Sequence, residues 1–80
     1  MSKQSAYFRA GSEIGGHLKN DIRRELSCLS GVLSVSIGNE NTDIAVDFDN
    51  SAADIFGIKS KLNDCGCSVR LERTENHPPD

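Results

Sequence analysis

The 80-residue chain lacks the features that mark several large classes of protein. It contains no apolar run near the ~20 residues that a bilayer span requires, so we expect no membrane insertion. Nine lysine and arginine residues against twelve acidic ones give a net charge of -3, which argues against binding to a nucleic-acid backbone. A chain of this size has room for one domain with a small core.

Cysteine and histidine are also scarce. Three cysteines are an odd number, so a fully paired disulfide framework is impossible. The first residues, Met1–Ser5, form no apolar signal segment, and we therefore expect reduced thiols and a cytoplasmic location. With two histidines, neither a catalytic triad nor a cysteine–histidine pair with an orienting acid can be assembled, so we predict that the protein is not an enzyme.

What the chain does contain is an alternation of strand and helix patterns. Four segments rich in β-forming or alternating residues are predicted strands, at 6–10, 32–37, 43–48 and 67–72. Two segments with apolar residues at helical spacing are predicted helices, at 17–30 and from Ser51 to 62. The first helix is expected to end at Gly31, because glycine adopts the left-handed conformation without steric cost.

The third strand and the second helix carry more detailed expectations. Along 43–48, the large apolar residues stand at even-numbered positions and are expected to face the helices, while the odd-numbered positions face solvent. Ser51 and Asp54 resemble a capping box, so the second helix is expected to begin at Ser51. Phe56 is expected to extend the apolar stripe of that helix.

Connection rules convert this order of elements into an architecture. A right-handed crossover joins the first two strands, the third strand fills the gap between them, and a second crossover places the fourth strand beside the first. The result is an α+β sandwich of βαββαβ order, with two helices on one face of a four-stranded antiparallel sheet. Three connections then meet at one end, which brings the loop 11–17 near the segment 65–67.

In this arrangement the chain resembles the heavy-metal-associated domain family, the small ferredoxin-like modules of copper chaperones and metal-pumping ATPases. The resemblance is carried by Leu29-Ser-Gly-Val32, Val35-Ser-Ile37, Ile44-Ala-Val-Asp-Phe-Asp49 and Leu62-Asn-Asp-Cys-Gly-Cys-Ser-Val69. It implies a ferredoxin-like fold and a non-catalytic role in binding or transferring a soft metal ion.

One feature of that family is missing from this chain. Family members bind metal through Cys-x-x-Cys in the loop after the first strand. Counting back from Gly31 places the two corresponding positions at Gly15 and Leu18. Neither side chain can ligate a metal ion, so the usual site is absent and the motif is degenerate.

A relocated metal site is one interpretation of the remaining residues. Cys65 and Cys67 form a Cys-x-Cys pair, and two thiolates suit a soft ion such as Cu(I) or Zn(II). His17 on the adjacent loop offers a third donor. In the other interpretation Cys67 is a small apolar core residue, Cys65 is a helix-end residue, and no metal is bound.

Two functions therefore stay open. One is the binding or transfer of a soft metal ion through the relocated site, and the other is a metal-free protein-interaction or ligand-sensing regulatory module of the same fold. Lys19, Arg23 and Arg24, on the exposed side of the first helix, offer a docking surface for a protein partner, although an ordinary solvated surface has the same composition.

The chain is expected to divide into three segments. Residues 1–4 form a flexible N-terminus, and residues 5–72 form the single heavy-metal-associated-like domain. Residues 73–80 are polar and end near a Pro-Pro pair, which predicts a disordered tail.

Overall fold

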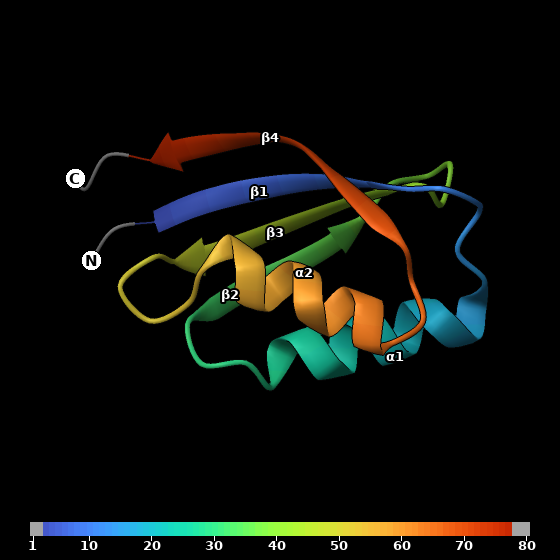
Figure 1. Ribbon diagram of the computed structural model, residues 1–80, viewed down its shortest axis with the longest axis horizontal. Coiled ribbons are helices and arrows are strands. Elements are labelled where there is room, and N and C mark those ends of the chain that lie inside the picture. Colours follow the sequence, from blue (N-terminus) through green and yellow to red (C-terminus); the bar gives the residue numbers. More distant parts are fainter. Residues whose placement is uncertain (1–2, 78–80) are drawn as a thin grey trace.

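The computed structural model describes residues 3–77 and has two layers. Two helices lie side by side across one face of a four-stranded sheet (Figure 1). None of the helices in the described part of the chain is long and apolar enough to cross a membrane. The elements, in chain order, are β1 (Lys3–Ala10), α1 (Gly16–Ser27), β2 (Val32–Ile37), β3 (Asp43–Asp49), α2 (Ile55–Asp64) and β4 (Val69–His77).

The sheet has the strand order β2-β3-β1-β4, and every neighbouring pair is antiparallel. The predicted βαββαβ sandwich is therefore confirmed. β1 and β3 occupy the centre, where the register places Tyr7 opposite Ala45 and Phe8 opposite Ile44. β2 and β4 form the two edges.

The core lies between the sheet and the helices, as the sequence pattern predicts. The even-numbered apolar residues of β3 are 0–1% exposed and face the helical layer. Ile22 and Leu26 of α1, and Ile58 and Leu62 of α2, are fully buried against them. Burial of each such side chain stabilises the fold by roughly 1.5–3 kcal/mol relative to leaving it exposed.

The turn between α1 and β2 depends on Gly31, which has a φ of 91°. A Cβ atom built on Gly31 would lie 2.9 Å from the Cβ of Ala52 and 3.0 Å from that of Ala53. The backbone N–H of Asp49 also donates a 2.7 Å hydrogen bond to the carbonyl of Gly31. Both the left-handed conformation and the close approach of the 49–53 turn therefore require glycine here.

The start of α2 differs from the prediction. The N-cap is Asp54, not Ser51, and the helix begins at Ile55. Ser51 instead donates from its backbone N–H and its hydroxyl to Asp49, at 3.0 and 2.7 Å, and so closes the turn after β3. Asp54 has an extended backbone and a side chain placed to accept from the first helical turn, which is the geometry of an N-cap.

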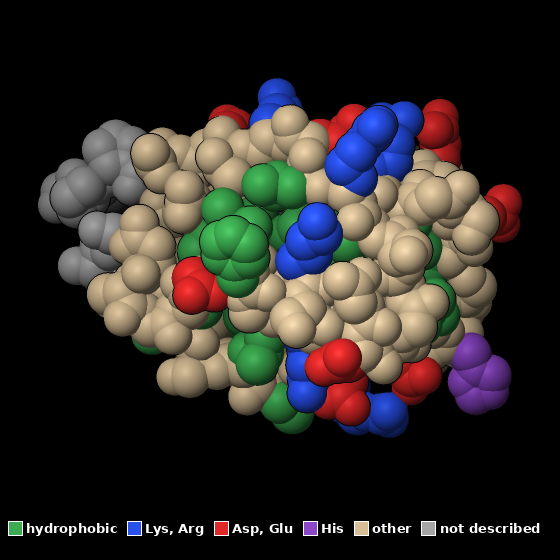
Figure 2. Space-filling view, viewed as in Figure 1, with side chains coloured by type: hydrophobic (Ala, Val, Ile, Leu, Met, Phe, Trp, Pro, Cys, Tyr) green, Lys and Arg blue, Asp and Glu red, His purple; other side chains and the backbone are tan. Residues whose placement is uncertain are grey.

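Phe56 was expected to extend the apolar stripe of α2, and this expectation is wrong. Its side chain is 86% exposed. Phe56 follows Ile55 and precedes Ile58 by two positions, and residues at these separations do not share a helix face. Figure 2 shows hydrophobic side chains at the surface over the beginning of α2.

The predicted tail is also corrected. β4 continues to His77, and its last residues pair with the first residues of β1, down to Lys3 opposite His77. Residues 73–77 and 3–4 are therefore strand residues rather than flexible ends. This polar segment can form a strand because its backbone groups make hydrogen bonds to β1. The predictions for residues 1–2 and 78–80 lie outside the described residues.

Candidate functional site

Three connections meet at one end of the sandwich, as the topology predicts. The backbone N–H of Gly11 donates to the carbonyl of Ser68 at 3.3 Å, and the N–H of Ile14 donates to the carbonyl of Asn41 at 2.7 Å. The loop after β1 is thus bonded both to the β2–β3 hairpin and to the segment before β4 (Figure 1). We call this end, formed by residues 11–15, 38–42 and 65–68, the rim.

The loop after β1 offers no metal donor at the two positions that the family resemblance assigns. Gly15 is the N-cap of α1 and makes no side-chain cap. Leu18 is half-buried and packs against the core. The neighbouring Ile14 is 2% exposed and points into the core as well. These positions therefore cannot hold a metal ion, and any site on the rim has to use other residues.

The two thiols of the rim lie at the end of α2. Cys65 is the C-cap residue and is half-buried. Gly66 has a φ of 93°, which reverses the chain, and the backbone N–H of Cys67 then donates a 3.0 Å hydrogen bond to the carbonyl of Leu62. The side chain of Cys67 is 4% exposed and belongs to the core.

Burial governs the protonation of both thiols. Desolvation raises the pKa of Cys65, the Glu25 carboxylate raises it further, and the ammonium group of Lys61 opposes this rise. Desolvation also raises the pKa of Cys67, and a negative charge on Cys65 adds to the effect. Only Gly66 separates the two cysteines along the chain. Both are protonated at neutral pH, because the rise starts from a thiol pKa of 9.0.

A third donor does not join the pair. Among residues 3–77, no group of three or more histidine, cysteine or acidic side chains lies close enough to hold a metal ion. His17 is exposed in the first turn of α1, so the predicted cluster of His17, Cys65 and Cys67 is not assembled. Cys28, the remaining free cysteine, is exposed at the other end of α1.

Acidic and basic side chains of both helices surround Cys65. They line a depression of about 260 Å³ between α1 and α2. Lys61 Nζ lies 3.6 Å from Glu25 Oε2, which joins the two helices, and Arg24 lies 2.9 Å from Asp21 on the same helix. Of the three predicted docking residues, Arg23 and Arg24 are exposed and Lys19 is half-buried.

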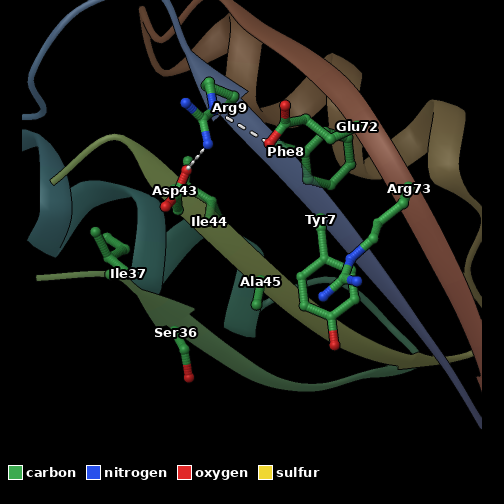
Figure 3. Close-up of a pocket in the computed structure, with 11 residues that line it drawn as sticks. Tyr7, Phe8, Arg9, Ser36, Ile37, Asp43, Ile44, Ala45, Glu72 and Arg73 are labelled. Atoms are coloured by element: carbon green, nitrogen blue, oxygen red, sulfur yellow. Dashed lines mark hydrogen bonds and ion pairs between the residues drawn. The ribbon is translucent and has the colours of Figure 1, made fainter. Parts of the chain in front are cut away.

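The other face of the sheet holds a groove that the sequence analysis missed. The groove has a volume of about 430 Å³ and is drawn in Figure 3. Arg9 reaches from β1 to Asp43 at 3.3 Å and to Glu72 at 3.1 Å. The Arg73 guanidinium stacks 4.4 Å from the centre of the Tyr7 ring. Hydrogen bonding to a neighbouring carboxylate, that of Glu75, raises the pKa of Tyr7.

This arrangement could not be read from the sequence because it depends on strand register. The pairing of β1 with β4 shifts between Tyr7 and Phe8, so that Tyr7 lies opposite Arg73 and Phe8 lies opposite Leu71. Glu72 is the extra residue of this bulge. The one sequence signal is that Tyr7 and Arg9 occupy odd positions of β1, whose even positions face the core.

Comparisons with known proteins bear on the fold. No protein-family model and no curated protein sequence matches the chain. Among solved structures, the N-terminal domain of a potential copper-translocating P-type ATPase from Bacillus subtilis is similar, with a TM-score of 0.82, 16% identity, and coverage of 91% of this chain and 91% of that chain.

Two further structures agree with it. The yeast copper transporter domain Ccc2a has a TM-score of 0.78 and 23% identity, and the alignment covers 88% of this chain and 96% of that chain. CopP from Helicobacter pylori has a TM-score of 0.74 and 27% identity, over 82% of this chain and 98% of that chain. The chain therefore has the ferredoxin-like fold of the heavy-metal-associated, copper-chaperone-like domains.

Proposed function

We propose that this chain is a non-catalytic binding domain that holds a soft metal ion, Cu(I), between Cys65 and Cys67. The proposal rests on two free thiols at the end of α2 that only Gly66 separates along the chain, on the same rim as the loop after β1. The similar folds of the copper-translocating ATPase domain and the yeast copper transporter domain support it.

The number of donors favours Cu(I) over Zn(II). Zinc sites in proteins are almost always four-coordinate when structural, and three protein ligands are usual when catalytic. The described residues bring no third donor to the pair. Thiolates are soft ligands that suit Cu(I), and two cysteines fall short of the three or four protein ligands that zinc usually takes. His17 is not needed in this arrangement.

Binding at this pair is coupled to proton release. A metal ion binds the thiolate, whereas burial keeps both thiols protonated at neutral pH. The ion therefore replaces protons in a partly desolvated site. Glu25 and Asp64 near Cys65 add negative charge that raises the thiol pKa and also attracts a cation.

We also propose that the domain meets a protein partner through α1. Lys19 and Arg23 are one turn apart on that helix, and neither forms an ion pair within residues 3–77, whereas Arg24 is held by Asp21. An acidic partner surface would complement them. A reducing compartment such as the cytoplasm suits the three unpaired cysteines.

A metal-free interaction module of the same fold is the second candidate. It is favoured by the burial of Cys67, which is 4% exposed and packs as a core residue, and by the loss of both donors from the loop. In that case the raised pKa of Cys67 reflects its burial in the core and the neighbouring Cys65, with no part in metal binding. The docking surface on α1 would then be the functional part.

Titration of the reduced protein with Cu(I) against a competing chelator separates the two candidates. We expect one ion per chain for the wild type and for Cys28→Ser, whose thiol is exposed at the far end of α1. We expect no uptake by the variant that combines Cys65→Ser with Cys67→Ser. Equal binding by that variant contradicts the ligand assignment, and no binding by the wild type favours the metal-free module.

A further inference from the structure

The two edges of the sheet differ in how they are protected. A strand at an edge presents unpaired backbone N–H and C=O groups, and charged side chains or bulges normally keep other strands away from them. β4 has both, since it carries four charged residues between positions 70 and 75 and a bulge against β1. β2, with the sequence VLSVSI, has no charged residue and no proline. Its pairing with β3 also shifts, between Val32 and Ser34, but residues 34–37 pair regularly beyond that bulge.

β2 is also only partly covered. None of its six residues is buried, whereas the alternate residues of β3 beside it are 0–1% exposed. Val35 and Ile37 lie opposite Val46 and Ile44 and face the helical layer, yet they remain partly exposed. Leu33 is 50% exposed. An apolar strip therefore runs along this edge.

The pattern of this strip is self-complementary. Apolar and polar residues alternate along 33–37, and this pattern is the same in both chain directions, although the end residues are Leu33 and Ile37. An antiparallel copy in register keeps Val35 and Ile37 on the covered face of both sheets and the serines on the open face. Residues directly opposite in such a pair share a face, so Val35 meets its own counterpart in the second copy and Ser34 meets Ser36.

We propose that β2 is the docking edge for a second copy of this chain. Two β2 strands pair in antiparallel fashion about a two-fold axis and join the two sheets into one continuous sheet. The interface is isologous, because the same strip contributes from both copies. No charge along either strand opposes the pairing. This association is independent of the proposed copper site, which lies at the end of α2.

The test is the molecular mass of the reduced, metal-free full chain, measured by sedimentation equilibrium over a range of concentrations. We expect a reversible shift from 8.7 kDa to twice that mass. Ser36→Lys, at an exposed position within β2, is expected to raise the dissociation constant of the dimer roughly tenfold or more. Because the interface is two-fold symmetric, the substitution places one lysine in each copy. Leu33→Lys, at a side chain already half exposed, is expected to act in the same direction.

The matched control is Asn76→Lys, which adds the same charge to the exposed β4 edge and should leave the dimer unchanged. The variant with serine at positions 65 and 67 should also dimerise as the wild type does.

Hydrogen exchange of the β2 amides should slow as concentration rises. A monomer at all concentrations overturns the proposal, as does a dimer that Asn76→Lys disrupts while Ser36→Lys and Leu33→Lys do not. If the strip serves an extended segment of another protein, the purified chain stays monomeric, which also counts against a second copy.

Discussion

The Oδ1 atom of Asp54 accepts a 2.7 Å hydrogen bond from the backbone N–H of Gly57 and thereby fixes the first turn of α2. The helix that begins here buries Ile58 and Leu62 against the sheet. The same helix ends at Cys65, the first thiol of the rim.

Asp54→Ala should destabilise the protein by about 1 kcal/mol, because it leaves a backbone donor of the first turn without its partner. Urea unfolding followed by circular dichroism measures the change. Ser51→Ala is the control, since Ser51 lies outside the helix and bonds to Asp49. If Ser51→Ala lowered the free energy of unfolding more than Asp54→Ala does, Ser51 rather than Asp54 would be the residue that stabilises the start of α2.

Gly31→Ala should cost about 2 kcal/mol or more. A residue with a side chain pays roughly 1–2 kcal/mol for the left-handed backbone, and the new methyl group would press against Ala52. Gly16→Ala is the matched control, because its added Cβ meets open space in the first turn of α1 and should stabilise by roughly 0.5–1 kcal/mol. Thermal or urea unfolding of both variants decides this. Equal effects would show that the turn tolerates a side chain.

The charges around Cys65 should tune its reactivity in opposite directions. Glu25 raises the pKa of Cys65 and Lys61 lowers it, so Glu25→Gln should speed alkylation at pH 8 and Lys61→Gln should slow it. Rates are measured in a background of Cys28→Ser and Cys67→Ser, so that one thiol reports. Glu40→Gln, in the exposed hairpin, should have no effect. Identical rates in all variants would mean that burial alone controls the thiol.

Copper affinity should increase with pH. Both thiols have a pKa raised above 9.0, so at neutral pH each must lose a proton before the ion binds. Below those pKa values, each pH unit should therefore strengthen apparent binding by roughly tenfold for every thiol that ligates the ion. Chelator competition at pH 6, 7 and 8 measures the slope. A pH-independent affinity, after correction for the chelator, would exclude the buried thiols as ligands.

Much of the fold could be predicted because it rests on local patterns. The alternation along 43–48 and the helical spacing of Ile22 and Leu26 each assign one face to the core, and the structure buries them as expected. Few topologies are compatible with that order of elements, which is why the crossovers and the meeting of the rim segments were predictable. These features depend on periodicity and chain connection alone.

The remaining features depend on contacts that the sequence pattern does not encode. The extension of β4 to His77 needs a partner strand, which β1 supplies. The start of α2 at Ile55 depends on the hydrogen bond that Asp54 accepts from Gly57. The separation of His17 from the thiols is also a matter of side-chain position. The topology predicts which segments lie close together, but it does not predict whether their side chains point toward one metal ion.

X-ray absorption spectroscopy of the reduced, Cu(I)-loaded full chain tests the central claim most directly, because it reports the donor atoms around the metal. We predict two sulfur ligands and no imidazole nitrogen, with the same spectrum for His17→Ala and for Cys28→Ser. A spectrum that contains a histidine nitrogen, or copper that is lost on desalting of the wild type, would contradict a site made of Cys65 and Cys67 alone.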